Sequence, residues 1–131
     1  MSEWMHVSAI FRLDSFGRIE DEEIIKISGK QVDFWHMNEI EYDENYEVKD
    51  KEQYLPMGSE GTLKMSIWHN PDKSSLASTT VSVFGDLRDF WDFDEIESWF
   101  NRCCNSFGKT TGVRQAVCQA TSSIGTKIFQ L

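Results

Sequence analysis

The stretch Asp92-Phe-Asp-Glu-Ile-Glu-Ser-Trp-Phe-Asn-Arg-Cys-Cys-Asn-Ser-Phe-Gly108 decides the fold, because it is the clearest helical pattern in the chain. Asp92 is a suitable N-cap, and Glu95 three residues later predicts a capping box. Gly108 suits the left-handed position that often follows a helix. The apolar residues recur with the spacing of one helix face, and they are Phe93, Ile96, Phe100, Cys103 and Phe107. The sequence therefore predicts a helix over residues 92–108, against which the other elements pack.

Segments on both sides of this helix alternate apolar and polar residues, which is typical of strands with one buried face. Residues 19–27 predict a short helix instead, because acidic residues precede an isoleucine-rich stretch there. Residues 32–37 are a candidate short strand. The alternation predicts strands over residues 4–13, 62–69, 78–84, 113–122 and 126–131.

This order of elements predicts one α+β domain over residues 1–131. We expect an antiparallel sheet with one long and one short helix on one face. The arrangement would be ferredoxin-like (split βαβ) plus an extra C-terminal strand. The other face would stay open, as an interaction surface or a homodimer interface. The large side chains expected on that open face are Trp4, His6, Ile10 and Trp68.

Composition favours a protein partner over duplex nucleic acid. The 131 residues carry a formal net charge of −9, and all 22 acidic residues precede residue 98. Phosphate contacts need Lys and Arg, so an acidic body disfavours direct duplex binding and favours a protein partner with a basic surface. Neither a membrane-spanning apolar run nor a signal peptide is evident. We therefore expect a cytoplasmic protein with no membrane contact.

Residues 38–60 form a variable acidic segment in which a loop and an edge strand are equally compatible with the sequence. In a strand, alternate acidic residues would point one way at a spacing of about 6.7 Å. Such a row could occupy a Lys/Arg groove that ordinarily binds phosphates, whereas the alternative is a solvated surface. The candidate partner-binding residues are Glu39, Glu41, Asp43, Glu44, Glu47, Tyr42 and Tyr46 here, with Trp4 and Trp68 on the open sheet face.

Signatures of catalysis, metal binding and cofactor binding are weak. Residues 108–112 resemble the end of a phosphate-binding loop, but Cys103 stands where the first glycine belongs and the segment follows a helix. The three histidines are scattered without metal-ligand spacing. Three cysteines, two of them adjacent, predict reduced thiols, and Cys103 falls on the apolar stripe. We therefore assign no catalytic residue, no metal ligand and no cofactor.

The segment Phe84-Gly-Asp-Leu-Arg-Asp-Phe90, followed by Ile96, Trp99-Phe100 and Val113-Arg-Gln-Ala116, resembles small uncharacterised acidic proteins of bacteriophages and mobile elements. The resemblance covers about the C-terminal half and carries over no active site. It implies a class whose members are often inhibitors of host defence or regulators.

The leading hypothesis is therefore a non-enzymatic acidic protein-binding module. Its sharper form is an anti-CRISPR-like or antirestriction inhibitor with a nucleic-acid-mimicking surface. The alternatives are a small-molecule or nucleotide-binding protein that uses the open sheet face, and an enzyme of unrecognised type.

Overall fold

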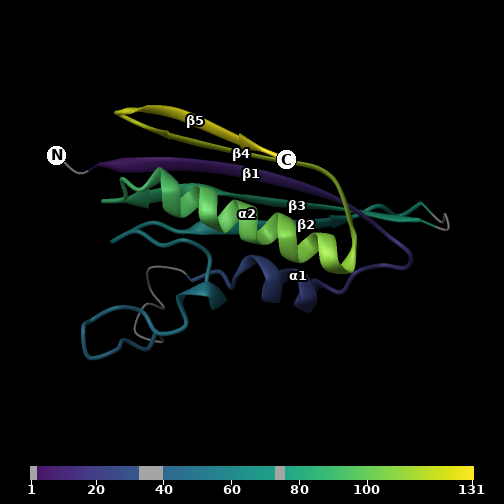
Figure 1. Ribbon diagram of the computed structural model, residues 1–131, viewed down its shortest axis with the longest axis horizontal. Coiled ribbons are helices and arrows are strands. Elements are labelled where there is room, and N and C mark those ends of the chain that lie inside the picture. The colour runs from purple at the N-terminus through teal and green to yellow at the C-terminus, as the bar shows by residue number, and fades with distance from the viewer. Residues whose placement is uncertain (1–2, 33–39, 73–75) are drawn as a thin grey trace.

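The computed structural model describes residues 3–32, 40–72 and 76–131, where five strands form one antiparallel sheet and two α-helices pack on it (Figure 1). The strand order across the sheet is β2-β3-β1-β4-β5. No helix in these ranges is long and apolar enough to cross a membrane. In chain order the elements are β1 (Trp4–Ser15), α1 (Asp21–Ser28), the 3-10 turn η2 (Lys51–Gln53), β2 (Leu63–His69), β3 (Ala77–Arg88), α2 (Phe93–Thr110), β4 (Gly112–Ser122) and β5 (Gly125–Gln130).

The core lies between the sheet and α2. Every second residue of β1 from Met5 to Leu13 is buried, which is the alternation expected of a strand with one covered face. The Phe11 ring lies 5.9 Å from that of Trp99 and 5.5 Å from that of Phe100, measured between centroids. The Phe107 ring also lies 5.5 Å from that of Phe11. Burying a side chain of this size contributes roughly 1.5–3 kcal/mol through the hydrophobic effect.

The predicted long helix is confirmed, with differences at both ends. The Asp92 carboxylate accepts hydrogen bonds from the backbone N–H groups of Asp94 (2.9 Å) and Glu95 (3.2 Å). The expected capping box is not formed as such, because the Glu95 carboxylate forms an ion pair with Lys51. This ion pair ties η2 to the first turn of α2.

The expectation that Gly108 follows the end of the helix is wrong. The helix continues to Thr110, and the backbone N–H of Thr111 donates to the carbonyl oxygen of Phe107 at 2.8 Å. The Thr111 hydroxyl donates to the same oxygen at 2.9 Å. Because Thr111 donates two hydrogen bonds to the Phe107 carbonyl, the helix ends without a left-handed glycine.

The short helix α1 is held by both α2 and the segment that follows η2. Ile24 is fully buried, and the indole N–H of Trp99 donates to the Ser28 carbonyl at 2.7 Å. Gly29 follows with a φ of +119°, and a Cβ there would lie 2.6 Å from the backbone nitrogen of Leu55. Only glycine therefore permits this close approach.

The remaining strands match their predictions, and β3 is longer than expected. It continues to Arg88, because its whole length pairs with β1, from Trp4 opposite Arg88 to Ser15 opposite Ala77. Most of the candidate strand at 32–37 lies outside the described residues.

The acidic segment forms a tight turn instead of an edge strand. Tyr42 pairs with Val48 in an isolated antiparallel bridge. Between them, one oxygen of the Asp43 carboxylate accepts the backbone N–H groups of Asn45 (2.8 Å) and Glu47 (2.9 Å). Asp43 therefore caps a turn, as aspartate commonly does, and no straight row of carboxylates forms in the described part of this segment. Glu39 lies outside the described residues.

All three cysteines are buried free thiols. Burial raises the pKa of Cys103 to about 12 and that of Cys118 to about 12, because the thiolate would lose its hydration. It also raises the pKa of Cys104. Thiolate is the reactive form, so burial keeps these core side chains largely in the unreactive thiol form.

Truncating the aromatic cluster should destabilise the protein strongly. Phe100→Ala is expected to lower the free energy of unfolding by about 3–5 kcal/mol, because it leaves a cavity beside Phe11. Urea titration followed by circular dichroism measures this. The matched control Trp91→Ala removes a ring that is 57% exposed and should change stability by no more than about 0.5 kcal/mol. Equal losses in both variants would contradict the assignment of the core.

Thiol chemistry gives an independent check of the same core. A disulfide-exchange reagent near neutral pH should modify none of the three cysteines rapidly in the native protein. All three should react once urea unfolds the chain, because exposure then restores the ordinary thiol pKa. Rapid native modification of Cys103 or Cys118, located by mass spectrometry, would show that the packing of α2 on β4 is wrong.

Candidate functional site

The face of the sheet opposite the helices is open and carries large apolar side chains. The expectation that Trp4, His6, Ile10 and Trp68 point away from the helices is confirmed, since all four are exposed. Phe84, Val117 and Ile128 add to this face from β3, β4 and β5. Whether any of them contacts a partner stays a prediction.

Most charges at the Trp4 end of the open face are paired. Nδ1 of His6 lies 2.5 Å from the Asp86 carboxylate on the neighbouring strand. Arg88, which pairs with Trp4 in the sheet register, forms a 2.7 Å ion pair with Glu60. Lys64 also lies at this end and forms no ion pair with a described residue, so it is a single unpaired positive charge there.

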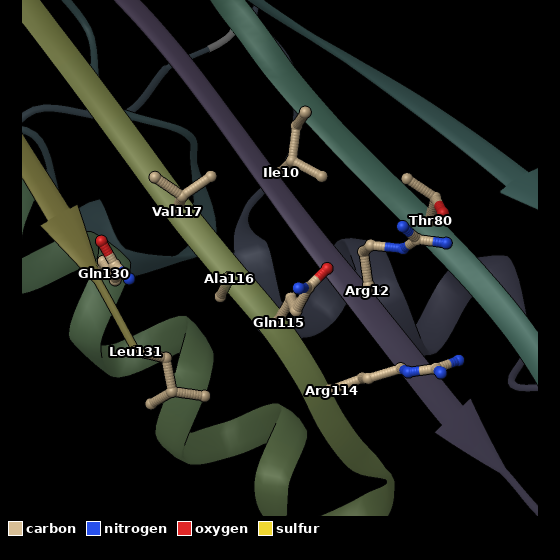
Figure 2. A pocket seen from close by; sticks show the side chains of 9 residues that line it. All are labelled: Ile10, Arg12, Thr80, Arg114, Gln115, Ala116, Val117, Gln130 and Leu131. Atoms are coloured by element: carbon tan, nitrogen blue, oxygen red, sulfur yellow. The ribbon is translucent and has the colours of Figure 1, made fainter.

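The other end of the open face holds a shallow depression of about 700 Å³, which Figure 2 shows from close by. This volume is within the range of small-molecule sites, although the depression is widely open to solvent. Strands β3, β1, β4 and β5 all contribute to it. Its lining residues are Ile10, Arg12, Thr80, Arg114, Gln115, Ala116, Val117, Gln130 and Leu131.

A β-bulge brings two consecutive residues of β4 to this depression. Arg12 pairs with Gln115 but Leu13 pairs with Val113, so Arg114 is an extra residue without an opposite partner on β1. In a regular strand, Arg114 and Gln115 would point to opposite faces. The bulge lets both line the same depression, which is the effect by which bulges re-aim side chains beside functional sites.

A second candidate surface lies on the helix side of the molecule (Figure 1). We call it the acidic end and define it as residues 41–52 together with 92–97. It contains ten acidic residues and two lysines. The two segments are joined by the ion pair between Lys51 and Glu95, and Glu52 also pairs with Arg102 further along α2 at 3.8 Å.

Most carboxylates of the acidic end are free to meet a partner. Glu52 and Glu95 form the ion pairs, while Asp43 and Asp92 cap backbone N–H groups. The other six form no hydrogen bond or ion pair through their side chains with any described residue, and they are Glu41, Glu44, Glu47, Asp50, Asp94 and Glu97. Tyr42 and Tyr46 are exposed beside them, at 45% and 89%.

His69 forms a contact that a single sequence did not indicate. Its Nε2 lies 2.6 Å from the Asp21 carboxylate, and its Nδ1 lies 3.0 Å from the Thr79 hydroxyl. These residue types also occur in nucleophilic triads. Thr79 is only 2% exposed, however, so a substrate cannot reach its hydroxyl. The cluster therefore attaches α1 to β2 and β3.

The residues predicted as one partner-binding set fall on two separate surfaces. The described acidic residues and both tyrosines belong to the acidic end, whereas Trp4 and Trp68 lie on the open face, on β1 and β2. Sequence reasoning missed Arg12 and Arg114. The signal that could have found Arg114 is the absence of acidic residues after position 97.

Neither a metal centre nor a known relative identifies the site. In the part of the chain that the structure describes, no group of three or more His, Cys, Asp and Glu residues is placed to hold a metal ion. Comparisons of the chain with protein-family models, curated proteins and solved structures find no match.

Proposed function

We propose that this protein is a non-enzymatic binding module whose acidic end docks onto a partner protein with a basic surface. The observation that carries the proposal is the set of six carboxylates that have no side-chain partner among the described residues, gathered on one part of the fold. Carboxylates that are not neutralised within the protein keep their full attraction for a basic partner. Such complementarity mainly accelerates and orients association.

Order within the acidic end supports the proposal. The Asp43 turn fixes the backbone from Glu41 to Lys49, whose N–H donates to the Glu41 carbonyl at 2.9 Å. The η2 turn is held against α2 by the ion pair between Lys51 and Glu95. A preorganised surface loses less conformational entropy on binding than a flexible acidic tail.

The sharper form of the proposal is an inhibitor that occupies a nucleic-acid-binding groove, in the manner of anti-CRISPR or antirestriction proteins. Clustered carboxylates can replace phosphates opposite Lys and Arg side chains. This form also rests on the resemblance of the C-terminal half to small acidic phage proteins, and it implies action in the cytoplasm.

We also propose that the fold is a ferredoxin-like variant. The first four strands follow the order β4-β1-β3-β2, with α1 between β1 and β2 and α2 between β3 and β4. This order supports a split βαβ connectivity. Strand β5 extends the sheet beyond β4, so the complete strand order differs from that of a four-stranded ferredoxin-like sheet.

Charge reversal tests the docking surface. The triple variant Glu41→Lys, Glu44→Lys, Glu47→Lys leaves Asp43 and its turn in place. Binding to a fluorescent oligolysine peptide, measured by anisotropy at low ionic strength, should weaken about tenfold or more. The fold should persist, because all three side chains are exposed.

A matched control separates a docking surface from overall charge. The variant Glu20→Lys, Glu22→Lys, Asp72→Lys changes the net charge equally at exposed positions outside the acidic end. It should weaken peptide binding much less than the first variant. Equal weakening by both variants would mean that the peptide responds only to net charge, and the proposed surface would be rejected.

The inhibitor form is tested by competition. The wild-type protein should displace a labelled oligonucleotide from an RNA-guided nuclease or a restriction endonuclease and should slow DNA cleavage. The triple Glu→Lys variant should lose this effect, while the matched control keeps it. If excess wild-type protein leaves DNA cleavage unchanged for several enzymes of both classes, the inhibitor role is rejected. The proposal of a protein-binding module would then stand without this role.

A further inference from the structure

Two arginines stand out on the open sheet face of an otherwise acidic protein. Arg12 lies on β1 and Arg114 on the bulge of β4, and both line the depression in Figure 2. Neither guanidinium forms an ion pair or a hydrogen bond with any described residue. The other arginine on this face, Arg88, is neutralised by Glu60. The depression is thus the part of the open face where positive charge is concentrated and unbalanced.

The sheet register surrounds these arginines with neutral polar groups. Arg12 pairs with Thr80 on one side and with Gln115 on the other. Figure 2 shows Arg12 and Arg114 extending in the same direction, with Gln115 beside them. A hydroxyl, a side-chain amide and two planar guanidinium groups therefore offer hydrogen-bond donors to one small volume. Guanidinium groups pair bidentately with phosphate and carboxylate oxygens, and two of them suit a dianion.

The next row of the sheet has two apolar residues at its centre. Ile10 pairs with Val117, both are 40% exposed, and Leu131 lines the same depression. Gln130 lies opposite Val117 on β5 and supplies one polar group at this margin. A ligand with an anionic end at the arginines could therefore lay an apolar or flat organic part over Ile10 and Val117.

We propose that this depression binds a phosphate monoester of a small organic molecule, with a nucleoside monophosphate as the fitting chemistry. The phosphate contacts Arg12 and Arg114, and the nucleoside covers the Ile10–Val117 row, where Gln130 offers an amide to the sugar or base. This site is independent of the acidic end and lies on the opposite side of the sheet.

Charge complementarity favours a small phosphate over a nucleic-acid strand. A strand must place many phosphates along a basic path, and its affinity depends on the number of Lys and Arg contacts. Beyond the two arginines the open face carries Asp14 and Asp86 as well as Lys64 and Arg88, of which Arg88 is paired with Glu60, and the whole chain has a net charge of −9. A single phosphate can be neutralised locally, whereas an extended polyanion would meet these acids.

Titration of the purified full chain with adenosine monophosphate tests the proposal. Isothermal calorimetry should detect saturable binding at ligand concentrations of about 1 mM or below. Arg12→Gln and Arg114→Gln should each weaken this binding about tenfold, because each removes a charge-assisted bidentate contact. Lys64→Gln is the matched control, since it removes one exposed positive charge from the same face outside the depression. It should leave the affinity within about twofold of that of the wild type.

Further ligands define the chemistry. Adenosine, which lacks the phosphate, and inorganic phosphate, which lacks the nucleoside, should both bind more weakly than adenosine monophosphate. The charge-reversed acidic-end variant should bind adenosine monophosphate as the wild type does, so that failure of one surface is distinguishable from failure of the other. Thermal melts of each variant confirm that these exposed substitutions leave the protein folded.

Several results would overturn the proposal. Absence of saturable binding by adenosine monophosphate would reject the site, as would unchanged affinity in both arginine variants. Adenosine binding as tightly as its monophosphate would show that the arginines contribute nothing. Inorganic phosphate binding as tightly as the nucleotide would reject the role of the Ile10–Val117 row. A single-stranded oligonucleotide could instead bind more tightly than adenosine monophosphate, in a manner that depends on the two arginines. The ligand would then be a nucleic-acid strand and not a small molecule.

Discussion

Packing of one phenylalanine on the central strand against the long helix is the interaction on which the rest of the structure depends. Phe11 contacts the rings of Trp99, Phe100 and Phe107, so two places on α2 that are about two turns apart are fixed on β1 at once. Trp99 then extends the attachment, because its indole N–H holds the Ser28 carbonyl at the end of α1. Both helices are therefore positioned through the same cluster, and no described helix or strand covers the opposite face of the sheet.

That asymmetry gives the protein two surfaces of different chemistry. The helix side carries the acidic end, whose charges lie on loops and first helical turns, where solvation and the helix dipole tolerate them. The open side carries aromatic and aliphatic side chains with two arginines that have no ion-pair partner among the described residues. An antiparallel sheet can keep one face solvated, so the fold permits both surfaces to exist without competing for the same residues.

The arrangement of the acidic end shows how a local hydrogen bond changes a surface. A strand through residues 41–43 would have aligned its carboxylates. Instead, the Asp43 carboxylate accepts two backbone N–H groups and closes a turn between Tyr42 and Val48. The charge density predicted from composition persists, but the carboxylates lie on this turn and on the following segment, which Lys51 ties to Glu95.

The sequence by itself determined the element types, the buried stripe of α2 and the outward direction of Trp4 and Trp68, because these follow from local periodicity and capping. It also determined that acidic residues crowd into the first 97 positions. Only the tertiary structure decided where the strands pair, that β4 carries a bulge at Arg114, and that Arg12 and Arg114 meet in one depression. The physical reason is that register and bulges arise from hydrogen bonds between residues far apart in the chain, and a single sequence carries no local signal of them.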